Sequence, residues 1–173
     1  MIKHIVAATD GSPNAQRAID FAIDLAAHYE AGLSVVYVIT SGKVSDNLRH
    51  MAEVEHIVDA GMQSRTPATV TFPATLVSEL GTTGERARAV LAKIGDFLVE
   101  KASKTAHKHG LVNVDTHVKN GDAAEVILEI AGDTDADLIV MGNRGLGNLK
   151  SLLLGSVSYK VNQLAKCSCV NVK

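Results

Sequence analysis

The amino-acid sequence predicts an α/β protein built on an open five-stranded parallel sheet with helices on both faces. Short apolar runs with strand character alternate along the chain with segments in which apolar residues recur at helical spacing. Hydrophobic residues make up 46% of the chain, aromatic residues only 3%, and tryptophan is absent. The core must therefore be built from Ala, Val, Ile and Leu, which suits helices packed on a parallel sheet. The length of 173 residues is enough for one domain, and we expect a single domain over residues 1–173.

The N-terminal segment predicts a strand, a helix and a second strand. The first strand is His4–Ala8. Ser12 is a good helix N-cap and Pro13 a good first helical residue, and apolar residues then recur at helical spacing down to Gly32, where a stop is expected. The β-branched run Leu33–Ile39 completes a βαβ unit, for which a right-handed crossover is expected.

The segment 40–84 is the least regular part of the chain. A parallel-sheet domain has no obvious need for so long a connection, and we interpret it as a variable insertion. Asp46–Met62 places apolar residues at near-helical spacing. Arg65–Thr83 is punctuated by Thr, Pro and Gly and predicts a loop or an extended, partner-contacting structure.

The alternation of helices and strands resumes after this insertion. Helical periodicity returns at Glu85 and ends at Gly110, and Val112–Val118 predicts the third strand. Asp122 and Glu125 then form a capping-box-like pair, with aspartate in place of the usual Ser or Thr, that opens another helix.

The last predicted elements are a strand at Leu138–Met141, a helix at Ser156–Lys166 and a final strand at Cys169–Val172. In open α/β sheets, ligands bind at the carboxyl ends of the strands where the strand order reverses. That rule places Asp10 and Gly142 on the same rim of the sheet.

A glycine pattern with the chemistry of a phosphate cradle follows the fourth predicted strand. Gly142 and Gly145 allow a close approach of the backbone to a ligand, and Gly155 and Ser156 open a helix whose first N–H groups can face an anion. The spacing is Gly-x2-Gly-x9-Gly-Ser. Turn glycines and a helix-capping serine are the alternative interpretation.

This pattern differs from two common phosphate-binding loops. A Walker A loop requires Gly-Lys followed by Ser or Thr, whereas Gly42 and Lys43 are followed by Val44. A dinucleotide fingerprint that began at Gly145 would require a third glycine where Lys150 stands.

Charge and hydropathy exclude several classes of partner. Seventeen Lys and Arg stand against nineteen Asp and Glu, the net charge is -2, and the basic residues are spread, so no nucleic-acid partner is expected. No apolar run approaches the roughly 18 residues of a membrane helix, and the N-terminal apolar strand is too short for a signal peptide. We therefore expect no membrane contact and a cytoplasmic location. The seven histidines show no metal-ligand spacing and are expected at the surface.

The two cysteines, Cys167 and Cys169, form neither a disulfide framework nor a zinc set, and they indicate a reducing compartment. Because they are two residues apart at the entrance to a strand, they can point to one face, where a redox or metal role is one interpretation. The other interpretation is that they pack as small residues under the sheet edge.

Taken together, these motifs resemble those of the universal stress proteins, small α/β proteins many of which bind ATP. Val6–Ser12 is similar to the family's opening strand and turn, and Leu138–Gly142, Gly145 and Leu153–Ser158 are similar to its nucleotide signature. The resemblance covers almost the whole chain apart from residues 40–84. It implies a Rossmann-like, adenine nucleotide alpha hydrolase-like fold, and the intact glycines place the chain with the ATP-binding branch.

The resemblance also implies a nucleotide site. Asp10 would face the ribose or the phosphates, and Val38 would offer backbone groups and a wall to the adenine. For Arg144, a phosphate contact and a solvated loop charge are both open. The implied nucleotide-binding residues are Ala8, Thr9, Asp10, Val38, Met141, Gly142, Arg144, Gly145, Gly155, Ser156, Val157 and Ser158. The implied ligand is ATP, ADP or AMP, with Mg²⁺ as a companion of the phosphates.

The family's usual dimer seam is the C-terminal strand, so the resemblance implies a homodimer through that strand. An uncovered edge strand would be a liability, which also favours pairing with a second subunit. The sequence departs from the family's pattern in this strand, because Ser168 and Asn171 stand where a proline and an apolar residue are usual.

Three hypotheses on function follow. The leading one is a stress-response or signalling module that binds an adenine nucleotide and whose output is a conformational or partner-binding change. The second is a slow ATPase or a self-phosphorylating protein with Ser156 or Ser158 as acceptor, and the third is a nucleotide-free interaction module that uses residues 40–84. No general base or Ser/His/Asp set can be assembled beside the glycines, so we assign no catalytic residue and favour a protein that is not an enzyme.

Overall fold

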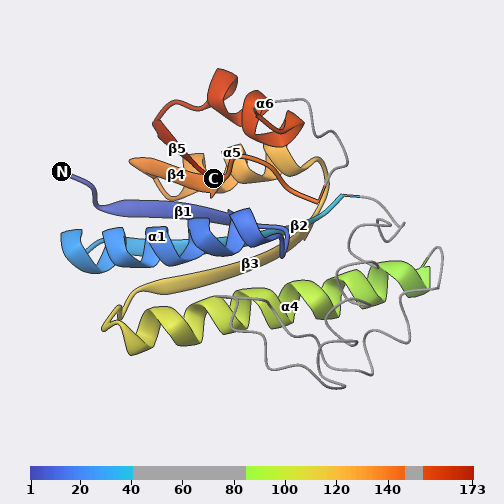
Figure 1. Cartoon of the computed structure of the whole chain (residues 1–173), viewed down its shortest axis with the longest axis horizontal. Helices are drawn as coiled ribbons and strands as arrows, with labels where there is room; N and C mark the ends of the chain where they lie inside the picture. The colour runs from blue at the N-terminus through green and yellow to red at the C-terminus, as the bar shows by residue number, and fades with distance from the viewer. Residues whose placement is uncertain (41–84, 147–153) are drawn as a thin grey trace.

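The computed structural model describes residues 1–40, 85–146 and 154–173. Within these residues, five parallel strands form one sheet in the order β3-β2-β1-β4-β5. Helices lie on both faces of the sheet (Figure 1), which confirms the predicted α/β class. The strands are β1 (His4–Thr9), β2 (Gly32–Ile39), β3 (Val114–Asn120), β4 (Leu138–Gly142) and β5 (Ser168–Val172). The helices are α1 (Pro13–Tyr29), α4 (Glu85–Lys108), α5 (Ala123–Asp133) and α6 (Ser156–Leu164). The predicted insertion after Thr40 and the segment that carries Lys150 lie outside the described residues.

The two faces of the sheet bury separate apolar clusters. Ile5 and Ala7 of β1 belong to the cluster beneath α1 and α4, whereas Val6 belongs to the cluster beneath α5 and α6. Figure 1 shows the two helix pairs on opposite sides of the strands. Because the inner strands are covered on both faces, their sequences are almost continuously apolar. Among the described helices, none is both long enough and apolar enough to cross a membrane.

Helix α1 begins as predicted and ends earlier than predicted. The Ser12 hydroxyl accepts a hydrogen bond from the Ala15 N–H at 3.2 Å, and proline is the first helical residue. Glu30 ends the helix in the left-handed conformation, with φ of 54°. The predicted stop at Gly32 is wrong: this residue begins β2, and a Cβ there would lie 2.7 Å from Nδ1 of His4.

The boundaries of the later elements also shift. Strand β3 starts at Val114, where it pairs with Leu33, whereas the sequence predicted a start at Val112, a residue that is 86% exposed. Gly110, with φ of 88°, turns the chain back after α4. Helix α6 ends at Leu164, two residues before the predicted end.

Two histidines expected at the surface are partly buried. The Nε2 atom of His4 lies 2.9 Å from the Ser34 hydroxyl, and burial lowers the pKa of His4 against the opposing charges of Asp115 and Asp137. The Nε2 atom of His117 is buried and has no hydrogen-bond partner among the described residues. The surface expectation is therefore wrong for this pair.

The strand order reverses between β1 and β4. Strand β1 pairs with β2 on one side and with β4 on the other, and Ala8 pairs with Met141 near the carboxyl ends. The loops that follow these two strands therefore leave the same edge of the sheet side by side. This arrangement confirms that Asp10 and Gly142 share one rim, at the point where open α/β sheets bind ligands.

Candidate functional site

The carboxylate of Asp10 joins the loop after β1 to the glycine loop after β4. Its Oδ1 atom accepts a hydrogen bond from the Ser12 N–H at 3.0 Å, and its Oδ2 atom accepts one from the Leu146 N–H at 2.9 Å. A Cβ at Gly145 would lie 2.1 Å from Oδ2. The glycine at position 145 is therefore required by the close approach of this carboxylate, which fixes the position of the glycine loop.

Gly142 packs against the first turn of α1. A Cβ at this position would lie 2.9 Å from the Ala15 backbone nitrogen and 3.0 Å from atoms of Asn14. Backbone of this kind cannot move aside without displacing the helix. The absence of a side chain at Gly142 is thus explained by packing within the protein.

Asn143, which belongs to none of the predicted motifs, connects the glycine loop to three other elements. Its N–H donates to the Val172 carbonyl of β5 at 2.7 Å, and its side-chain oxygen accepts a hydrogen bond from the Asn14 amide of α1 at 2.7 Å. Its carbonyl accepts the Gly155 N–H at 2.8 Å. The one signal in the sequence is that a polar residue directly follows an apolar strand and Gly142. In the structure this asparagine is only 8% exposed.

Helix α6 begins at the same rim with a glycine in its N-cap position. Gly155 occupies the N-cap position with φ of -71° and ψ of 158°, and as a glycine it offers no side chain of its own to the free N–H groups of the first turn. The first intrahelical bond runs from the Tyr159 N–H to the Gly155 carbonyl at 2.8 Å. The N–H groups that precede it are directed out of the helix, with the positive end of the helix dipole.

The predicted side chains on the first turn of α6 differ in their surroundings. Ser156 is exposed and Val157 is 37% exposed. Ser158 is only 5% exposed, and its hydroxyl donates to the Gly142 carbonyl at 2.9 Å. Ser158 thus holds α6 to the end of β4, whereas Ser156 remains open to solvent.

Arg144 is a cationic side chain in the described part of the glycine loop. It is half-buried, and its Nε atom is buried without a hydrogen-bond partner among the described residues. Its Cα atom lies 3.5 Å from the position that a Cβ on Gly155 would occupy. The Cα atom of Arg144 therefore lies next to the N-terminus of α6.

The remaining predicted residues line the same end of the sheet. Ala8, Val38 and Met141 all pack on the face covered by α5 and α6. Thr9 is 9% exposed, and its hydroxyl accepts the Gly11 N–H at 3.2 Å. The structure thus brings the predicted residues of β1, β4 and α6 into direct contact, and Val38 follows on the neighbouring strand β2.

The site favours an anion over a metal ion bound by side chains. Among the residues that the structure describes, no group of three or more His, Cys, Asp and Glu could hold a metal. Burial, and to a smaller degree the charge of Asp10, raise the pKa of Tyr37 at the end of β2, so this hydroxyl stays neutral. Among the described residues, the available recognition groups are backbone N–H groups, a helix N-terminus and Arg144, which suit phosphate oxygens.

An open parallel sheet, with a glycine loop and a glycine-capped helix N-terminus at its switch point, is typical of the α/β proteins that bind ligands at the carboxyl ends of their strands. Comparison with known proteins identifies the group within this class. The chain belongs to the universal stress protein family, whose sequence model matches residues 1–173.

Individual relatives agree with this membership along the full length of the chain. The universal stress protein YxiE of Bacillus subtilis is 31% identical over 173 residues, which cover 100% of both chains. The solved structure of the universal stress protein UspA from Lactobacillus plantarum superposes with a TM-score of 0.68 at 20% identity, covering 99% of this chain and 98% of that one. A universal stress protein solved in complex with cAMP has a TM-score of 0.58 at 24% identity, covering 99% of this chain and 97% of that one.

Proposed function

We propose that this protein binds an adenine nucleotide, ATP in the first place, at the rim formed by β1, β4 and the start of α6. The observation that carries the proposal is Gly155. Among the residues that the structure describes, the nearest atoms to a Cβ at this position lie 3.5 Å away, which is ordinary contact, and its φ of -71° suits any residue. Nothing in residues 1–40, 85–146 and 154–173 requires glycine there, so the missing side chain is best explained by a ligand that approaches the helix N-terminus closely.

The known complexes of related proteins support adenine as the base. One universal stress protein was solved in complex with cAMP, and that of Archaeoglobus fulgidus was solved in complex with dAMP. Both ligands combine an adenine with a phosphate. The proposed site offers matching surfaces for both parts of such a ligand. Apolar residues of β1, β2 and β4 suit the adenine, and the N–H groups and the arginine suit the phosphate.

Several of the predicted residues receive a role in this proposal. The N–H groups at the start of α6 bind the outer phosphates, and the Arg144 guanidinium neutralises part of their charge, with any Mg²⁺ held by the phosphates themselves. Ala8, Val38 and Met141 supply the wall for the base. Asp10 acts mainly by holding the glycine loop, since one backbone N–H already occupies each of its oxygens, although a ribose hydroxyl can still donate to a remaining lone pair.

The biological output that we propose is a change in partner binding within a stress response. The protein would act in the cytoplasm as a homodimer through β5. This strand lies at the edge of the sheet and pairs with β4 on its inner side. Edge strands expose unpaired backbone groups, which a second copy can satisfy.

The test is calorimetric titration of the purified protein with ATP, ADP and AMP, after acid extraction has shown which nucleotide co-purifies. Gly155→Ala keeps the protein's own packing and should weaken ATP binding by about tenfold or more, because the methyl group occupies the ligand's approach. Gly132→Ala is the matched control, since a Cβ there meets nothing within 4 Å. Equal ATP affinities for the wild type and Gly155→Ala would refute the assignment.

The alternative of a self-phosphorylating protein depends on Ser156. Its side chain is exposed on the first turn of α6, whereas the Ser158 hydroxyl is buried and donates to Gly142. Incubation with γ-labelled ATP should leave the protein unlabelled and release no excess phosphate if the nucleotide is only bound. Label that disappears in Ser156→Ala would establish the enzymatic alternative instead.

A further inference from the structure

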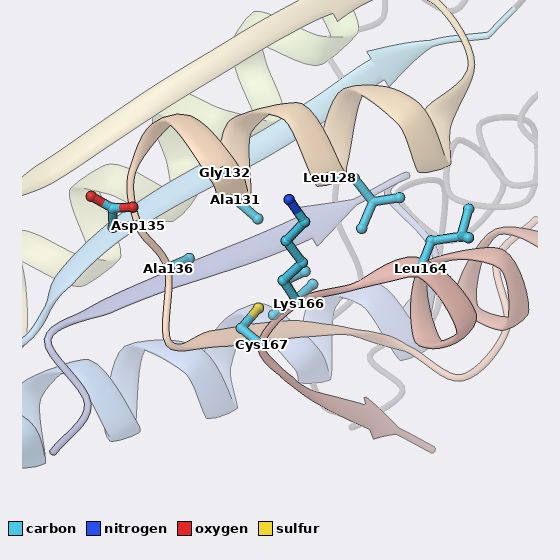
Figure 2. Close-up of a pocket in the computed structure, with 9 residues that line it drawn as sticks. Leu128, Ala131, Gly132, Asp135, Ala136, Leu164, Lys166 and Cys167 are labelled. Atoms are coloured by element: carbon cyan, nitrogen blue, oxygen red, sulfur yellow. The ribbon is translucent and has the colours of Figure 1, made fainter.

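Helix α6 is short, and its far end packs loosely. Of its nine residues, two are buried, Ser158 and Val161. A cavity of about 420 Å³ lies at the end of the helix, and Figure 2 shows its lining residues, which come from α5 on one side and from Leu164 and the following segment on the other. The polar contacts that α6 makes with α5 through Lys160 and with β5 through Asn162 are exposed, and exposed ion pairs stabilise little. Packing at this end therefore leaves the direction of α6 weakly determined.

Hydrogen bonds to the end of β4 and the glycine loop hold the other end of α6. The Gly155 N–H donates to the Asn143 carbonyl at 2.8 Å, and the Ser158 hydroxyl donates to the Gly142 carbonyl at 2.9 Å. Because the Gly155 N–H is used within the protein, the N–H groups of residues 156–158, which precede the first intrahelical bond, are the donors left for an anion. Their direction follows from the position of the loop.

Two side chains of α1 set the position of Asn143. The NH2 group of Asn14 donates to the Asn143 side-chain oxygen at 2.7 Å. At the other end of the Asn14 amide, the Nη2 group of Arg17 donates to the oxygen, and Nε of the same arginine donates to the Lys173 carbonyl at 2.7 Å. A guanidinium group can only donate hydrogen bonds, so Arg17 fixes the amide orientation in which the NH2 group of Asn14 faces Asn143.

We propose that Asn14 is a positioning residue for the phosphates of the nucleotide and acts through Asn143. This inference rests on the proposed nucleotide site. Asn143 receives the Asn14 amide on its side chain and the Gly155 N–H on its carbonyl, so a shift of Asn143 also moves the start of α6. Hydrogen bonds weaken steeply when donor and acceptor are misaligned. Asn14 therefore raises the affinity for a ligand with a phosphate chain and has no effect on the affinity for adenosine.

The test compares ATP with adenosine, which has the same base and ribose but no phosphate. In calorimetric titrations of the full chain, Asn14→Ala should weaken ATP binding by about tenfold and change adenosine binding by less than about twofold. The substitution changes no charge. Gln16→Ala is the matched control, because the Gln16 amide donates to Asp20 of the same helix at 3.0 Å, and its affinities should equal those of the wild type. Thermal unfolding verifies that each variant is folded.

A double variant tests whether Asn14 acts through Asn143. In an Asn143→Ala background, Asn14→Ala should change the ATP affinity by less than about twofold, because the connection is already broken. A full tenfold loss in that background would overturn the proposal, since Asn14 would then act independently. Equal losses of ATP and adenosine affinity in the single variant would also overturn it, because they would show a general disturbance of the site.

Hydrogen exchange of the nucleotide-free protein tests the connection without a ligand. The Gly155 N–H should exchange about threefold to tenfold faster in Asn14→Ala than in the wild type, and an unchanged rate would overturn the proposal. A wild type that does not bind ATP would refute the proposed function and this role with it. A wild type that binds ATP with the same affinity as Asn14→Ala would refute the positioning role alone.

Discussion

Replacement of Asp10 by asparagine tests whether this carboxylate holds the glycine loop. The carboxylate accepts one backbone N–H on each oxygen, from Ser12 at 3.0 Å and from Leu146 at 2.9 Å. An asparagine amide offers one oxygen and one NH2 group. In either orientation, its NH2 group faces a backbone N–H that has lost its acceptor. Asp10→Asn therefore removes one charge-assisted hydrogen bond and leaves a donor against a donor.

The loss of such a bond corresponds to about 1.5 to 3 kcal/mol of unfolding free energy. For a chain of this size, that change lowers the melting temperature by roughly 3 to 12 °C. Urea unfolding followed by circular dichroism measures the free energy directly. Asp24→Asn, at an exposed position of α1, is the control and should stay within about 0.5 kcal/mol of the wild type.

A second variant separates the loop contact from other effects of Asp10. Gly145→Ala places a methyl group 2.1 Å from Oδ2 of Asp10 and so breaks the same contact from the other side. The double variant should lose less stability than the sum of the single variants, by about 1 kcal/mol. Additive losses of unfolding free energy would refute the conclusion that the Asp10 carboxylate holds the glycine loop. So would an Asp10→Asn protein with unchanged stability and weakened ATP binding, which would show a carboxylate that acts only on the ligand.

Three further variants test the packing and the pH dependence of the fold. Gly142→Ala directs a methyl group to 2.9 Å from the Ala15 backbone nitrogen and should cost about 1 to 3 kcal/mol of unfolding free energy in urea. Gly95→Ala places a methyl group 2.5 Å from a ring carbon of buried Tyr37 and should lower the urea midpoint in the same way, whereas an unchanged midpoint would show that the ring moves freely. Two backbone N–H groups of the N-terminal segment lower the pKa of Asp137 below its ordinary value of 3.8, so its stabilisation is present above that pH and is lost as the pH falls through the folded pKa. Asp137→Asn should therefore show a shallower fall of melting temperature than the wild type between about pH 5 and pH 2, and parallel curves would contradict this assignment.

The order and type of the described elements could be predicted because their signals are local. Aliphatic runs, the Ser12-Pro13 helix start and the Asp122 cap each act within a few residues of the chain. The ends of elements were less predictable where a distant residue decides them. Glycine stands at the start of β2 because the His4 ring, on the neighbouring strand, occupies the space that a side chain at position 32 would need.

In the candidate site, too, local features could be predicted from the sequence and contacts between distant residues could not. The topological rule placed Asp10 at the correct rim, but the partner of its second oxygen, the Leu146 N–H, lies 136 residues further along the chain. Asn143 was missed for the same reason, because its partners lie on α1, β5 and α6. Side-chain patterns predict a helix or a strand, but they do not predict which backbone N–H group will bond to a given side-chain oxygen.

The three glycines of the signature illustrate how far a motif can be interpreted without the structure. The sequence pattern assigned Gly142 and Gly145 to a close approach of a ligand, and Gly155 to the start of a helix that faces an anion. In the structure, Gly142 is required by the backbone of α1 and Gly145 by the carboxylate of Asp10, so substitutions there perturb the fold whether or not a ligand binds. Measured against the described part of the chain, Gly155 alone of the three has room for a Cβ. A loss of nucleotide binding is therefore diagnostic of ligand contact at Gly155, whereas at Gly142 the same loss would measure mainly the position of α1.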